Sequence, residues 1–220
     1  MKRGKGLGFS AGELMEQVFD LVVLNLLFLL CCLPVVTVGA SLSALHRVLL
    51  QWVRGDDSYR VRAFFGAFRR EFRQSTVLWL PMLPAIVVLY FDQAILLPHL
   101  EGFYRVVLFV ASLVLEVFLA LQFIYAFPLQ ARYANPVRQT VKNALLLGIW
   151  KFPYTICAAV AYLILPVLYL SVPAAQPVVM ILYLVCGFSV PGLAADWLVN
   201  RVFLSVFAGE REKQERDKLS

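Results

Sequence analysis

The chain has 220 residues, of which 61% are hydrophobic and 15% are charged, and its mean hydropathy is +0.77. A soluble domain carries about 25% charged and 45–50% apolar residues, so this composition excludes an ordinary water-soluble fold and indicates one integral membrane domain. The net charge of +6 is expected to mark membrane topology, because cytoplasmic loops collect Lys and Arg, and it predicts no nucleic-acid partner.

The first apolar region covers residues 14–53 and carries only three charged side chains. One interpretation is a single tilted helix. The other is a tight hairpin with arms at about 14–33 and 37–53. Pro34 would interrupt a continuous helix, because proline removes a backbone donor and clashes with the preceding turn.

Residues 58–75 are expected to form an amphipathic helix at the inner face of the membrane. Val61, Phe64, Phe65, Phe68 and Phe72 recur with helical spacing and form one face. The candidate contacts to anionic lipid or to a partner protein are Arg60, Arg62, Arg69, Arg70 and Arg73. Such a helix would lie in the plane of the lipid headgroups.

The later apolar runs predict two helical hairpins. Residues 74–91 carry no charge, and 106–131 carry a single charge, so these two runs pair across a turn at 97–102. Residues 152–195 are 44 residues without charge, or roughly 66 Å of helix. A hydrocarbon core is about 30 Å thick, so this run must cross twice, and its prolines place the reversal at 171–177.

The basic residues set the predicted orientation. Of the 20 Lys and Arg, 18 fall in four segments, which are the N-terminal tail, 54–73, 132–151 and the tail from 201. Six helices place all four segments on one side, whereas five would place the N-terminal tail opposite the others. We therefore favour six helices over five, in the cytoplasmic membrane, with both termini cytoplasmic. The predicted division is one transmembrane domain at 1–205 and a charged cytoplasmic tail at 206–220.

Polar residues at membrane depth are the candidate functional residues, because an ionised side chain at the bilayer centre costs roughly 2.5–3.5 kcal/mol. Glu116 is expected near the midplane, either as a proton or substrate site or as an interhelical hydrogen-bond anchor. Asn25 is a candidate interhelical donor, and Asp92 lies toward the outer end of its helix. Asp196 and Lys151 could pair across neighbouring helices.

No enzyme motif is present, since the chain lacks HExxH, GxSxG and GxxxxGK[ST]. The two histidines, His46 and His99, are expected near opposite membrane faces. The four cysteines lie within apolar runs and have no metal-ligand spacing. We therefore expect no catalytic site, no cofactor and no metal.

Five sequence blocks resemble the YesL-like family, also called domain of unknown function 624. The blocks are 25–41 (NLLFLLCCLPVVTVGAS), 64–75 (FFGAFRREFRQS), 89–92 (LYFD), 128–133 (PLQARY) and 142–145 (KNAL). The resemblance covers about residues 10–205, and its first block is the most specific. It implies a bacterial, membrane-embedded, uncharacterised protein whose relatives often accompany genes for carbohydrate uptake and oligosaccharide breakdown. It implies no binding or catalytic residue.

Three functional hypotheses follow. The leading one is an accessory membrane protein of carbohydrate uptake that contacts a sugar importer permease through its basic inner helix. The second is a small secondary transporter that uses Glu116 as a central carboxylate. The third is a structural or regulatory membrane protein without a ligand. The oligomeric state stays open.

Overall fold

The computed structural model covers residues 11–55, 59–133 and 135–219 and is all-α, as predicted, with no strand in these ranges. The longer helices are α1 (Ala11–Cys32), α2 (Val38–Val53), α3 (Arg60–Trp79), α4 (Met82–Phe91), α6 (Gly102–Leu121), α8 (Val137–Trp150), α9 (Phe152–Ser171), α10 (Gln176–Cys186) and α11 (Ser189–Leu219). The shorter elements are α5 (Leu97–His99), α7 (Phe127–Arg132), the 3₁₀ turns η1 (Val35–Thr37) and η4 (Pro173–Ala175), and the π turns η2 (Asp92–Leu96) and η3 (Gln122–Ala126). The predicted N-terminal tail and Ser58 lie outside the described residues.

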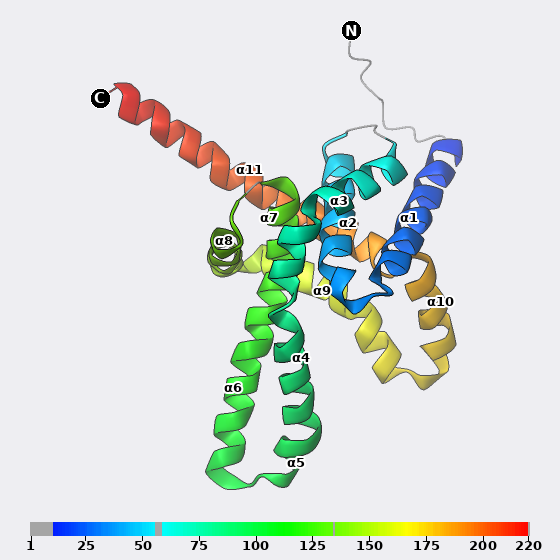
Figure 1. The fold of residues 1–220 in the computed structure, drawn as a ribbon, viewed down its shortest axis with the longest axis vertical. Helices are drawn as coiled ribbons and strands as arrows, with labels where there is room; N and C mark the ends of the chain where they lie inside the picture. Colours follow the sequence, from blue (N-terminus) through cyan, green and yellow to red (C-terminus); the bar gives the residue numbers. More distant parts are fainter. Residues whose placement is uncertain (1–10, 56–58, 134, 220) are drawn as a thin grey trace.

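Two long helical hairpins diverge from a common body (Figure 1). One consists of α4 and α5 beside α6, and the other of α9 and α10. α1 and α2 form a third antiparallel pair, which contacts α10 through α1. α11 leaves the body on the side away from α10 and runs without a break through the predicted domain boundary at 205. The two long hairpins turn at the segments that the sequence predicted, 97–102 and 171–177.

The apolar helices make the chain a multi-pass membrane protein. Within the described residues, four helical stretches are long and apolar enough to cross a bilayer, namely Met15–Cys32, Met82–His99, Gly102–Arg132 and Phe152–Ser171. A fifth candidate is the broken pair α10 and α11, whose axes differ by 62°. The predicted arms at 14–33 and 37–53 are present as α1 and α2, but α2 has only 16 residues. Six spans therefore stay a prediction.

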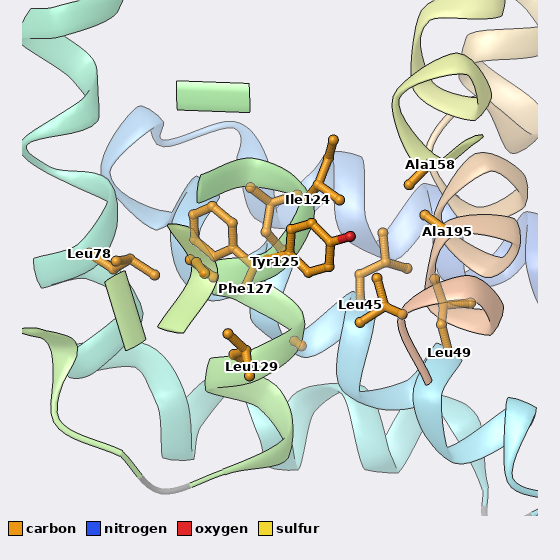
Figure 2. Packing of buried hydrophobic residues seen from close by; sticks show 14 of the residues in the cluster. Leu45, Leu49, Leu78, Ile124, Tyr125, Phe127, Leu129, Ala158 and Ala195 are labelled. Atoms are coloured by element: carbon orange, nitrogen blue, oxygen red, sulfur yellow. The ribbon is translucent and has the colours of Figure 1, made fainter. Parts of the chain in front are cut away.

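α2 is the central helix of the body. It contacts α1, α3, α7 and α11, and its side chains from Gly39 to Leu50 are buried apart from Arg47. Figure 2 shows its Leu45 and Leu49 in the same core as Tyr125, Phe127 and Leu78. A helix this short and this enclosed is held by its neighbours, because its apolar surface faces protein rather than lipid.

The crossing of α2 and α3 is very close at Gly39. A methyl group at Gly39 would lie 2.5 Å from the backbone oxygen of Ser75 and 2.5 Å from Cβ of Trp79. Around this point, Ser75 Oγ donates to Ser43 Oγ at 2.7 Å, and Trp79 Nε1 donates to the Val35 carbonyl at 2.9 Å. Small residues permit such close packing of helices in membranes.

We expect Gly39→Ala to lower the free energy of unfolding by about 1–3 kcal/mol, because the added methyl group must push α3 away from α2. The control is Gly66→Ala on α3, where a methyl group meets no atom within 4 Å. Unfolding in mixed detergent micelles measures both. Equal stability of the two variants would contradict the close crossing.

Proline explains the two π turns. η2 ends immediately before α5, which contains Pro98, and η3 ends immediately before α7, which contains Pro128. A proline inside a helix cannot donate to the fourth residue before it and clashes with that residue's carbonyl. The helix widens by one residue in the preceding turn, a recognised response to such strain.

The predicted amphipathic helix is present as α3, but only part of its predicted apolar face is buried. Phe64, Ala67, Glu71 and Ser75 form the buried stripe of α3, the helix that packs most closely on α2. Val61, Phe65 and Phe72 are 44%, 43% and 37% exposed. The buried stripe is displaced toward small residues because α2 presents Gly39 and Ser43 at the crossing. The exposed phenylalanines are left to face lipid or a partner.

Candidate functional site

Two side-chain hydrogen bonds join α6 to the end of the helix beside it. Ser112 Oγ donates to Asp92 Oδ2, and Gln93 Nε2 donates to Glu116 Oε1. Asp92 and Gln93 begin the π turn η2, while Ser112 and Glu116 lie one turn apart on α6. The structure thus brings the predicted residues Asp92 and Glu116 onto the same hairpin, each bonded to a neutral partner.

Asn25 lies elsewhere, at the break between α10 and α11. Its Nδ2 donates to the carbonyls of Tyr183 and Leu184 at 3.0 and 2.9 Å. Its Oδ1 accepts from the backbone N–H groups of Phe188 and Ser189 at 2.9 and 3.2 Å. One fully buried amide therefore satisfies backbone groups on both sides of the break. We call this arrangement the Asn25 clamp.

His46 and Asp196 form a buried pair that connects α2 to α11. His46 Nδ1 lies 2.9 Å from Asp196 Oδ2 and 3.0 Å from Oδ1, and the two residues are 1% and 0% exposed. The predicted pairing of Asp196 with Lys151 is absent, and Lys151 Nζ instead lies 5.6 Å from the centre of the Trp150 ring. α11 presents Asp196 to α2, so the carboxylate meets the histidine of that helix.

Two buried hydroxyl groups lie along the same stretch of α11. Tyr162 Oη of α9 and Ser189 Oγ of α11 have no hydrogen-bond partner among the described residues. A methyl group at Gly192 would lie 3.8 Å from Tyr162 Oη, and Tyr162 interacts electrostatically with Asp196. Ser189, Gly192 and Asp196 follow at spacings of three and four, so they share one helix face. No local sequence pattern indicates this polar cluster, because its members, together with His46, come from three separate apolar helices.

Of the basic residues that were predicted to contact lipid or a partner, two form ion pairs and three are exposed without one of the ion pairs described here. Arg60 pairs with Asp20 and lies 3.7 Å from the centre of the Trp52 ring. Arg70 pairs with Glu71 at 2.8 Å while remaining half exposed. The exposed remainder is Arg62, Arg69 and Arg73. Their spacings of seven and four place them on one face of α3, which we call the basic face.

Two further arginines join α7 to its neighbours. Arg47 Nη1 donates to the carbonyl of Ala131 at 2.5 Å, and Arg132 Nη1 donates to Asn200 Oδ1 at 2.7 Å. Cations at a helix C-terminus satisfy the last carbonyls and complement the helix dipole. These contacts fasten the C-terminal end of α7 to α2 and α11.

An apolar cavity of about 330 Å³ lies between the long hairpins. Its lining residues are Trp79, Met82, Ile86, Leu119, Ala120, Phe123, Ile124, Ala159, Tyr162 and Leu163. A second cavity of about 220 Å³ lies between α6, α8 and the junction of α3 with α4. Neither cavity is lined by Glu116 or Asp92.

Comparison with known proteins gives a family match without an activity. Residues 21–93 match the family described as "Protein of unknown function, DUF624". The chain is similar to the uncharacterized protein YteU of Bacillus subtilis (strain 168), with 28% identity over 135 residues that cover 61% of this chain. The aligned part spans 60% of the length of that relative. No solved structure matches the chain.

Proposed function

Since the chain belongs to the DUF624 family, as its sequence blocks predicted, we propose that it is an accessory membrane protein that binds a permease of carbohydrate uptake through its basic face. The observation that carries this proposal is the exposure of Arg62, Arg69 and Arg73 on a helix whose opposite face is fixed to α2. The proposed orientation keeps this face, and both chain ends, on the cytoplasmic side of the cell membrane.

The basic face is held in a defined position. The close approach at Gly39 and the hydrogen bond from Ser75 hold α3 against α2, and the hydrogen bond from Trp79 holds it to η1. A binding surface presented on a rigid helix requires little ordering when a partner docks. Arginine is also enriched where binding energy concentrates in protein interfaces.

The basic face also carries apolar side chains. Phe65 and Phe72 are exposed on α3 beside the arginines. Such a surface suits the headgroup region, where phenylalanine contacts acyl chains and arginine contacts anionic lipid or acidic residues of a protein. Anionic lipid and the inner end of a permease are therefore the proposed contacts.

The geometry favours binding over transport. Glu116 bonds to an exposed glutamine on the adjoining helix, and the two cavities that border α6 are lined without it. A transporter needs its coupling carboxylate at a cavity that alternates between the two sides. The choice of a sugar permease as partner rests on the carbohydrate genes that accompany the resembling family.

We expect the variant Arg62→Gln/Arg69→Gln/Arg73→Gln to lose at least tenfold of the permease that co-purifies with the protein from native bacterial membranes. The substitutions keep side-chain length and remove the charge that contacts the partner. The matched control is Arg138→Gln/Lys142→Gln, which removes exposed positive charge from α8 instead. Quantitative mass spectrometry of the purified complexes measures the outcome.

Two results would contradict the proposal. One is equal recovery of the permease with the triple variant and with wild type. The other is proton-driven solute flux in liposomes of the purified protein that disappears in Glu116→Gln, which would identify a transporter instead.

A further inference from the structure

The His46–Asp196 pair lies where three helices meet. α2 supplies the imidazole, α11 supplies the carboxylate, and α9 supplies the unpartnered hydroxyl of Tyr162. No group of three or more His, Cys, Asp or Glu side chains that could hold a metal ion occurs in the described part of the chain. The chemistry of the pair is therefore that of hydrogen bonding and proton binding.

Burial determines how many protons the pair can hold. An isolated charge is strongly disfavoured in an apolar interior, so the pair as a whole must be close to neutral. A neutral imidazole beside an ionised carboxylate carries one negative charge. The pair therefore becomes neutral only when it binds one further proton. The pair then shares one proton between His46 Nδ1 and the Asp196 carboxyl group, whose oxygens lie 2.9 and 3.0 Å from Nδ1.

Other charged groups near α2 are already engaged. Within the described residues, Asp20 of α1 pairs with Arg60, Glu71 of α3 with Arg70, Arg132 of α7 with Asn200, and Arg47 of α2 with the Ala131 carbonyl. Tyr162 of α9 is the titratable side chain that faces Asp196 from outside the pair. His46 is therefore the group with which Asp196 can share a proton.

The pair is also close to the break between α10 and α11. Asp196 lies seven residues beyond Ser189, where α11 begins after its 62° break from α10. The Asn25 clamp holds the break to α1, and the His46–Asp196 pair holds the following two turns to α2. Movement of the first half of α11 away from α2 must separate the pair.

We propose that His46 and Asp196 form an internal proton-binding site that locks α11 onto α2. The proton is retained while the helices are in contact. It is released at neutral and alkaline pH when α11 separates and water reaches the imidazole, because an exposed histidine has a pKa of about 6.5. Opening of α11 is thereby linked to release of one proton, independently of any partner that the basic face binds.

The presence of only two histidines permits a direct test. The protein, labelled with ¹⁵N-histidine in nanodiscs, gives two imidazole spin systems, and His99→Gln identifies that of His46. We expect the His46 shifts to stay constant from pH 5.5 to 8.5, because the buried pair keeps its proton while the helices are in contact. Asp196→Asn should change the His46 shifts at pH 7, because it removes the group with which His46 shares the proton. Wild-type His46 shifts that change within this pH range would overturn the proposal.

The linkage to helix opening has its own measurement. Hydrogen exchange of α11 amides, corrected for intrinsic exchange, reports the opening equilibrium. Above pH 7 we expect the opening equilibrium constant of wild type to rise about tenfold per pH unit, because the open form has one proton fewer. The near-isosteric His46→Gln/Asp196→Asn variant should show no such dependence. Identical pH profiles of the two proteins would refute proton-linked opening and leave a purely structural contact.

Discussion

Asn25→Leu should lower the free energy of unfolding by about 3 kcal/mol or more, because it leaves up to four backbone groups at the α10–α11 break without partners. Each orphaned buried group costs about 1–3 kcal/mol. The Asn25 clamp uses both donors and the acceptor oxygen of one amide, so no apolar side chain can replace it. Titration with sodium dodecyl sulfate in mixed micelles measures the loss.

Two comparisons make this test specific. Asn25→Asp keeps the acceptor for Phe188 and Ser189, but its carboxyl group, protonated in this buried site, can donate to only one of the carbonyls of Tyr183 and Leu184, so its loss should be intermediate. Asn143→Leu removes the same amide from α8, and we expect less than about 1 kcal/mol from it. Similar stability of Asn25→Leu and Asn143→Leu would show that the clamp contributes nothing.

His46→Leu should lower the free energy of unfolding by about 3–5 kcal/mol, because it leaves the buried carboxylate of Asp196 without its partner. The double variant His46→Leu/Asp196→Leu should recover most of that loss, since apolar residues of similar volume often replace a buried pair without penalty. The recovery distinguishes an uncompensated charge from simple loss of packing.

The control for this cycle is His99→Leu, at an exposed position on α5, with an expected loss below about 1 kcal/mol. A double variant as unstable as the sum of its two single variants would mean that His46 and Asp196 do not interact. The same detergent titration measures wild type, His46→Leu, Asp196→Leu, the double variant and His99→Leu, so the energies are directly comparable.

The sequence predicts which polar residues lie in apolar helices, but it does not predict their partners. Glu116, Asp92 and Asn25 are candidates because a polar side chain in an apolar helix needs a hydrogen-bond partner. The sequence does not identify that partner. The structure gives Glu116 and Asp92 neighbours on one hairpin and places Asn25 at a distant helix break. The partner of Asp196 could not be predicted, since His46 is 150 residues away and belongs to another helix.

The sequence by itself determined the all-α class, the apolar spans, the turns at 97–102 and 171–177, and a helix over most of 58–75. Helix formation, proline breaks and transfer into lipid depend on local composition, so a single chain segment contains the information. Only the tertiary structure decided that α3 buries Phe64 but exposes Phe65 and Phe72, and that His46 meets Asp196. Those contacts depend on how closely helices cross and how they are rotated, and these quantities are set jointly by residues that lie far apart in the chain.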